Sequence, residues 1–225
     1  MSGEIETSLL TKQVYDVLKG KIIGRKYNPG EKLDINKIAD EFGVSRSPVK
    51  DAINQLVHEG LIEIIPRKGT YVTELNLTDF IEVLDARLMI EMWAAQKIIQ
   101  TVTDEQMDEW EQIVEEMDSL LDVTPFPFEL YVDLDMKFHR TLVQWAANKK
   151  VQEVYSSLNT HVALSRLVHA TSFESTLKRH KDHQCLCEAM RERDLPSFLG
   201  KIKLHINSLK KELKKQWDEG LQDGI

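Results

Sequence analysis

The chain contains 225 residues, of which 42% are hydrophobic and 29% are charged, a composition that suits a soluble protein with a buried core. This length fits one large domain or two of ordinary size. No apolar run approaches the roughly 20 residues that a membrane-spanning helix needs. The acidic N-terminus lacks the basic and apolar segments of a signal peptide. We therefore expect a cytoplasmic protein without a membrane partner.

Charge is distributed unevenly along the chain. Residues 1–75 contain eleven lysines and arginines and eleven aspartates and glutamates, so they carry no net charge. Residues 76–225 contain eighteen basic and twenty-six acidic residues and account for the whole net charge of −8. Because an acidic protein is not a general binder of polyanions, any binding to nucleic acid requires a local basic face. We expect that face in the neutral N-terminal third.

Short elements are predicted up to residue 75. Apolar periodicity predicts a first helix over residues 8–25, capped by its first residue, and Asp34 and Ser45 are the N-caps predicted for two shorter helices. Residues 61–65 and 70–74 are rich in β-forming side chains and are joined by a Pro-Arg-Lys-Gly turn, which predicts a hairpin.

From residue 76 onward the pattern is almost entirely helical. Thr103 and Gln106 form a predicted capping box, and the short joins between long helices favour an antiparallel bundle. The predicted helices span residues 77–100, 104–121, 129–147, 150–169, 173–191 and 195–216. The sequence thus predicts a mainly α protein with an N-terminal domain, residues 8–75, and an all-α C-terminal helical bundle, residues 76–220.

Two of the short helices have the spacing of a helix–turn–helix. Residues 42–45, Phe-Gly-Val-Ser, join them, and the glycine permits a positive φ where the chain reverses. The next helix is predicted to expose Arg46, Ser47 and Lys50 at its N-terminal end, while Val49 faces the core. A recognition helix needs donors for guanine edges and phosphates at that end.

The predicted hairpin adds a second basic feature. Arg67 and Lys68 at its tip are placed to reach an adjacent phosphate or the minor groove, and Gly69 permits a close approach. The alternative is a small helical domain whose exposed charges serve only to solvate it. The DNA-binding residues predicted from the two features are Ser45, Arg46, Ser47, Lys50, Arg67, Lys68 and Gly69.

Four segments of this region follow a known pattern. They read NPGEKL at residues 28–33, IADEFGVSRSPVKDAI at 38–53, LVHEGLI at 56–62 and KGTYV at 68–72. They closely resemble the winged helix–turn–helix of GntR-family transcriptional regulators, over nearly all of residues 8–74. The resemblance implies that Arg46 and Lys50 contact double-stranded operator DNA and that the wing glycine lies near the minor groove. The chain departs from the family at Asn36, where an arginine is usual, and at position 50, where lysine replaces another common arginine and loses its bidentate fork.

One predicted helix of the bundle carries a carboxylate and an imidazole on the same face. Asp135 and His139 are four residues apart, so their side chains lie one turn apart on one side of the helix. Neighbouring apolar residues indicate that this face points inward. A buried carboxylate and imidazole need a compensating charge or hydrogen bonds.

Two further histidines occupy matching positions in the last predicted helical hairpin. Its turn is centred near Asp194, eleven residues from both His183 and His205. Each histidine therefore lies roughly 16 Å from the turn at ~1.5 Å per residue, level with the other. Beside the Asp-x-x-x-His face they would form an Asp/His/His/His cluster suited to a divalent transition metal. The alternative is four unrelated polar groups, because spacing alone does not place the third helix beside the hairpin.

Four segments of the C-terminal region carry a second resemblance. They read LDARLMIE at residues 84–91, DMKFHR at 135–140, HQCLCEAM at 183–190 and LH at 204–205. They are similar to the FCD effector domain of the FadR subfamily of GntR regulators, over most of residues 76–215. The resemblance implies a metal beside a cavity that receives small organic acids, in a domain that mediates homodimerisation. The implied metal ligands are Asp135, His139, His183 and His205.

Arg87 is the candidate for pairing with an effector carboxylate, since a guanidinium meets a carboxylate through two parallel hydrogen bonds. An ordinary surface or interhelical ion pair is the alternative for this residue. Zinc is the first candidate for the metal, and nickel, manganese and iron also tolerate these ligands.

Three functions are compatible with these features. The favoured one is a homodimeric transcriptional regulator that binds a pseudo-palindromic operator and whose helical domain binds a divalent metal and a small organic-acid effector. The second is a metalloenzyme, since an open metal site activates water, although no HExxH-type base accompanies the ligands. The third is a repressor for which the metal ion itself is the signal.

Overall fold

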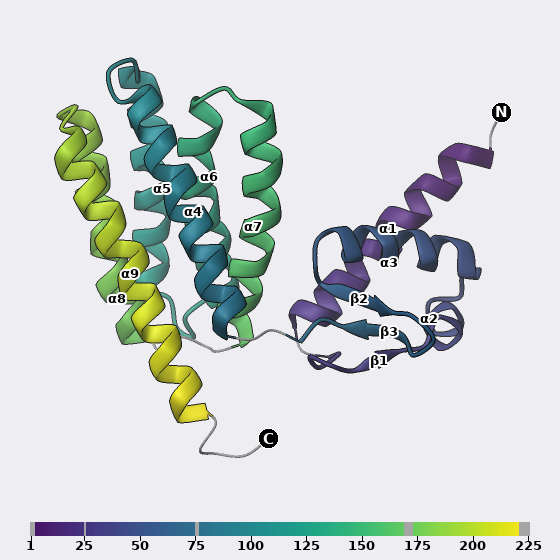
Figure 1. Ribbon diagram of the computed structural model, residues 1–225. Helices are drawn as coiled ribbons and strands as arrows, with labels where there is room; N and C mark the ends of the chain where they lie inside the picture. The colour runs from purple at the N-terminus through teal and green to yellow at the C-terminus, as the bar shows by residue number, and fades with distance from the viewer. Residues whose placement is uncertain (1–2, 25, 75–76, 169–172, 221–225) are drawn as a thin grey trace. The chain divides into compact units, whose positions relative to one another are not determined.

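The computed structural model describes residues 3–24, 26–74, 77–168 and 173–220 of the chain. The chain divides into two compact units, Met1–Asn76 and Leu77–Ile225 (Figure 1). Within the described residues the first unit combines helices with a small sheet, and the second is entirely helical. None of the helices in this part of the chain is long and apolar enough to cross a membrane.

The N-terminal unit consists of α1 (Gly3–Ile23), β1 (Lys32–Leu33), α2 (Ile35–Phe42), α3 (Arg46–His58), β2 (Ile62–Ile65) and β3 (Gly69–Val72). It is built around α3, against which α1, α2 and β2 pack. The three strands are antiparallel in the order β1-β3-β2, so β3 is the central strand. The sheet therefore extends the hairpin that the sequence predicts by one short strand.

Both ends of α2 form as the sequence predicts. Asp34 Oδ1 accepts hydrogen bonds from the backbone amides of Asn36 and Lys37, and Gly43 ends the helix with a φ of 65°. Ser45 occupies the N-cap position of α3 with an extended backbone, but its side chain makes no capping hydrogen bond. The hydroxyl at the start of α3 is therefore not used to cap the helix.

Two elements of this unit differ from the prediction. The first helix begins at Gly3, so Ser8 lies inside α1 rather than at its start; no proline or glycine interrupts the residues between them, and the helix continues through them. Arg25, the predicted end of this helix, lies outside the described residues. The sequence does not predict β1, because a pairing of two residues leaves no alternating pattern to detect.

The C-terminal unit consists of α4 (Leu77–Ile98), α5 (Asp104–Leu121), α6 (Phe128–Trp145), α7 (Lys149–Val168), α8 (Phe173–Arg191) and α9 (Leu195–Gly220). The helices pack as a closed ring in the order α4, α9, α8, α5, α6 and α7, with α7 returning to α4 (Figure 1). α4 also contacts α6 across the ring. Side chains from α4, α6, α8 and α9 can therefore meet inside it.

Helix boundaries in this unit follow the prediction closely. α5 and α8 begin and end at the predicted residues, and the capping box of Thr103 with Gln106 is confirmed. α9 continues past residue 216 to Gly220, since no helix-breaking residue intervenes. His169, the predicted end of α7, lies outside the described residues.

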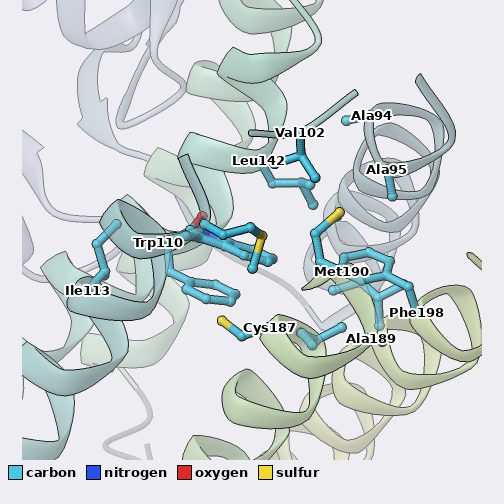
Figure 2. Packing of buried hydrophobic residues seen from close by; sticks show 14 of the residues in the cluster. Ala94, Ala95, Val102, Trp110, Ile113, Leu142, Cys187, Ala189, Met190 and Phe198 are labelled. Carbon is cyan, nitrogen blue, oxygen red and sulfur yellow. Dashed lines mark hydrogen bonds between the residues drawn. The ribbon is translucent and has the colours of Figure 1, made fainter. Parts of the chain in front are cut away.

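Trp110 of α5 lies in the hydrophobic core of this unit. Its ring stacks on Phe138 of α6 with centroids 4.2 Å apart, and its Nε1–H donates to the Phe138 carbonyl oxygen at 2.8 Å. Met190 of α8 and Phe198 of α9 belong to the same cluster (Figure 2). Because His139 follows Phe138 in α6, this packing also fixes the helix that carries two of the predicted metal ligands.

Candidate metal centre and DNA-binding surface

One carboxylate and three imidazoles meet inside the ring of helices. Each residue offers one ligand atom, and the four atoms lie within 4.8 Å of one another. His183 Nε2 is 3.2 Å from Asp135 Oδ1 and 3.3 Å from His139 Nε2. All four side chains are buried. The residues are Asp135 and His139 of α6, His183 of α8 and His205 of α9.

The helical hairpin of α8 and α9 supplies two of the imidazoles. The turn at residues 192–194 brings His183 and His205 level, with ring centroids 4.9 Å apart. The ring of His139 stacks on that of His205 at 5.1 Å. The closed ring of helices thus decides the point that sequence spacing leaves open, because it turns α6 toward the hairpin.

Two acidic residues orient imidazoles from outside the cluster. Glu91 Oε2 lies 2.9 Å from His139 Nδ1, and Asp182 Oδ2 lies 3.2 Å from His205 Nδ1. A carboxylate at Nδ1 keeps the imidazole proton there and leaves the Nε2 lone pair available to a metal. Neither acid is predicted from the sequence to belong to the site. An acidic residue on the inner face of α4, and one next to His183, are the signals that point to them.

Two nitrogen atoms of the cluster lack partners. His205 Nε2 and His183 Nδ1 are buried and have no hydrogen-bond partner within the described residues; such an atom costs about 1–3 kcal/mol. Burial lowers the pKa of His139 to about 4 and that of His205 to about 3, so both imidazoles are neutral at pH 7. One carboxylate oxygen and three imidazoles with available lone pairs are compatible with binding of a divalent transition metal.

Arg87 of α4 is buried beside Glu91. Its Nε–H donates to Glu91 Oε1 at 2.7 Å, and the Tyr155 hydroxyl donates to the same oxygen. Burial opposes the ionised form of Glu91, but the hydrogen bond from His139 and the positive charge of Arg87 outweigh it and hold the pKa of Glu91 well below its usual range. Arg87 thus forms an ion pair within α4, neither at the surface nor between helices. Its Nη2 has no partner among the residues that the structure describes.

The N-terminal end of α3 has the arrangement predicted for a recognition helix. Arg46, Ser47 and Lys50 are exposed, whereas Pro48 and Val49 are buried. Ser45 is also exposed, with a hydroxyl that does not cap the helix. This end of α3 therefore presents two cations and two hydroxyl groups to solvent.

The turn between β2 and β3 presents two more cations. Arg67 and Lys68 are exposed, and Arg67 adopts a left-handed φ of 64°. Gly69 has a φ of 133°, and a Cβ added there would lie 2.8 Å from Lys32 Cε. The space that Gly69 leaves open is therefore filled by a third basic side chain of the same unit.

Both units match known protein families. Residues 10–72 match the model of bacterial regulatory proteins of the gntR family, and residues 82–207 match the FCD domain. The chain is a GntR-family transcriptional regulator with an FCD domain.

This regulator has bacterial relatives of similar length. It is 25% identical to the uncharacterized HTH-type transcriptional regulator YdhC of Bacillus subtilis, with 94% of each chain covered. It is 26% identical to the HTH-type transcriptional repressor RspR of Escherichia coli, covering 84% of this chain and 82% of that one. The solved structure of E. coli McbR/YncC shares its fold, with a TM-score of 0.76 at 18% identity over 92% of this chain and 98% of the other.

Replacing one imidazole is expected to leave the metal-free regulator at least as stable as the wild type. His205→Leu puts an apolar side chain of similar size at a buried position, and Asp182, whose side chain is 39% exposed, remains hydrated. Because the unpaired Nε2 is removed, we expect the free energy of unfolding to stay equal or to rise by up to about 1–3 kcal/mol. Urea denaturation of the two chelator-treated proteins measures the difference.

The control for this variant is Ile206→Ala, which creates a cavity at a neighbouring buried position and should lose about 2–5 kcal/mol. A loss of similar size in His205→Leu would mean that His205 serves the packing of the metal-free fold.

Proposed function

We propose that this regulator binds a pseudo-palindromic double-stranded operator as a homodimer, and that its FCD domain binds a divalent metal and a small organic-acid effector that changes operator affinity. The observation that carries the sensing part of this proposal is the convergence of four buried ligand atoms within 4.8 Å. Membership of the GntR family supports the DNA-binding part.

The exposed end of α3 supports a division of roles on the operator. Arg46 is proposed to donate to a guanine edge, and Lys50 to contact a base or a phosphate as a single point charge. Ser45 and Ser47 would donate to phosphates, while Arg67, Lys68 and Gly69 form a wing beside the minor groove. Two copies of α3 in a dimer would read successive major grooves.

The donor set supports a metal in the FCD domain. Asp135 Oδ1 and the inward-facing nitrogens of His139, His183 and His205 would hold it, with Glu91 and Asp182 fixing two of the imidazoles. Zinc is the first candidate, and nickel, manganese and iron accept the same ligands. A bound ion of this kind supplies coordination positions that an anionic oxygen can fill.

Arg87 supports an acidic effector. Its guanidinium is buried, and its Nη2 carries a donor that lacks a partner within the described residues. We propose that an effector carboxylate accepts this hydrogen bond beside the metal. A coupling of only ~1–3 kcal/mol between effector and operator is enough for regulation.

A metalloenzyme built on the same ligands is not favoured, because the relatives compared above are named as transcriptional regulators. Turnover of an organic acid by the metal-loaded protein would favour it, whereas stoichiometric binding without turnover favours sensing. A repressor for which the metal is the signal predicts that chelation changes operator affinity. Chelation that abolishes effector binding but leaves operator affinity unchanged argues against that version.

Arg46→Ala is expected to weaken operator binding and to relax its sequence preference. Loss of one base contact from a charged side chain costs about 1–3 kcal/mol of discrimination. The measurement is fluorescence anisotropy with a duplex selected from random DNA, repeated over a range of salt concentrations, since wild-type binding should weaken steeply as salt rises. The control is Lys12→Ala, which removes an exposed cation from α1. Equal affinities for Arg46→Ala and the control, or a flat salt dependence of the wild type, would count against the proposed contact.

One metal ion per chain is expected in the purified regulator, and His183→Ala is expected to lose it on dialysis. The substitution removes the imidazole whose Nε2 lies 3.2 Å from Asp135 Oδ1 and 3.3 Å from His139 Nε2. Elemental analysis by mass spectrometry identifies the ion and its stoichiometry. His58→Ala removes an exposed histidine of the other unit and should keep the full complement. Metal retained by His183→Ala would contradict the assigned ligands.

Arg87→Gln is expected to weaken binding of the acid effector by roughly tenfold or more, because a hydrogen bond to a charged group contributes about 1.5–3 kcal/mol. Calorimetry of the metal-loaded protein with acetate, malate and gluconate, and with the uncharged amides of these acids, measures the effect. Arg140→Gln removes an exposed arginine from α6 and serves as the control. Binding of the acids that is unchanged in Arg87→Gln would remove Arg87 from the effector site.

A further inference from the structure

The Glu91 carboxylate holds two different parts of the site at once. Its Oε1 accepts from Arg87 Nε at 2.7 Å and from the Tyr155 hydroxyl. Its Oε2 lies 2.9 Å from His139 Nδ1. The side chains of Arg87, Glu91 and His139 are at most 1% exposed, so water does not screen these contacts. A single buried carboxylate therefore joins the arginine proposed to meet the effector to a proposed metal ligand.

The second acid at the cluster is a natural comparison. Asp182 lies 3.2 Å from His205 Nδ1, in the same relation to its imidazole as Glu91 has to His139. Its side chain, however, is 39% exposed, and no arginine or lysine of the described residues forms an ion pair with it in the structure. The two imidazoles are therefore oriented alike, but only His139 is linked to a buried cation.

We infer that Glu91 is a positioning residue through which the charge of Arg87 sets the affinity of the metal site. The positive charge of Arg87 partly neutralises the Glu91 carboxylate. Glu91 therefore accepts a weaker hydrogen bond from the Nδ1–H of His139. When the positive charge of Arg87 is removed or compensated, Glu91 binds that N–H more strongly, and the imidazole becomes a better electron donor at Nε2. This inference rests on the proposed metal site.

The same coupling links binding of the effector to binding of the metal. An anion that pairs with Arg87 Nη2 compensates the guanidinium charge and thereby tightens the metal, so a bound metal must equally tighten the anion. The coupling needs no movement of the helices. It makes the metal and the acid favour each other even before the acid coordinates the ion.

The test is a double-mutant cycle on zinc affinity, measured by competition with a fluorescent chelator. Arg87→Gln is the central variant, because the glutamine amide nitrogen stands at the same position along the side chain as Arg87 Nε. It retains a donor for Glu91 Oε1 while it removes the charge and Nη2. We expect Arg87→Gln to bind zinc at least roughly twofold more tightly than the wild type, the lower end of the coupling between residues in contact.

Glu91→Gln completes the cycle. An amide that donates to His139 Nδ1 leaves the imidazole proton on Nε2, where the metal should bind, and an amide turned the other way places its NH₂ against Arg87. We expect zinc affinity to fall roughly 10- to 100-fold. In the Glu91→Gln background, Arg87→Gln should have no further effect.

Asp182→Asn is the matched control. It should weaken zinc binding in the same way, since Asp182 orients His205, but Arg87→Gln should keep its full tightening in this background. A general loss of structure would weaken every variant instead. The expected pattern is therefore tightening by Arg87→Gln with Asp182→Asn and no change with Glu91→Gln.

Two results would overturn the inference. One is that Arg87→Gln leaves zinc affinity unchanged or weakens it. The other is that it tightens zinc binding equally with and without Glu91, which would mean that the charge of Arg87 acts on the metal directly and not through Glu91. Absence of zinc binding by the wild type would instead refute the proposed metal site. If Glu91→Gln does not fold by circular dichroism, proton NMR of Arg87→Gln decides: the His139 Nδ1–H resonance should move downfield while that of His205 stays in place, and equal or absent shifts refute the coupling.

Discussion

Inside the ring of helices, an aspartate and three histidines share a buried space, and two neighbouring carboxylates contact their imidazoles. Burial disfavours charge, so His139 and His205 remain neutral at pH 7 and offer lone pairs. Glu91 and Asp182 fix which nitrogen of these imidazoles keeps the proton. The buried His205 Nε2 has no hydrogen-bond partner within the described residues, a cost that metal binding would offset.

The hydrophobic core and the polar cluster are continuous. Phe138 stacks on Trp110 and also meets the ring of His183, with the Phe138 and His183 centroids 4.8 Å apart in an edge-on arrangement. α6 is thus held by core packing at the level where Asp135 and His139 face inward. Rigid packing of this kind limits the freedom of the donors, which favours a metal that matches their spacing.

The two units differ in net charge. The acidic residues lie mainly in the helical unit, where some of them form ion pairs or contact histidine side chains. The N-terminal unit has no net charge. Its exposed cations at the start of α3 and at the hairpin tip are the groups that we propose attract DNA locally. In this proposal a regulator that is acidic overall binds an operator through local basic groups without binding polyanions in general.

Sequence alone determined the features that depend on neighbouring residues: the capped ends of α2 and α5, the inward face shared by Asp135 and His139, and the level positions of His183 and His205. Helical periodicity and turn length set these, because each is a property of one element or of two joined by a short turn. Only the tertiary structure decided that α6 meets the α8–α9 hairpin, that Glu91 and Asp182 orient the imidazoles, and that Arg87 pairs within α4. Those contacts depend on how the side chains of six helices pack together in one ring. Such packing involves residues far apart in the sequence, so no single segment of the chain predicts it.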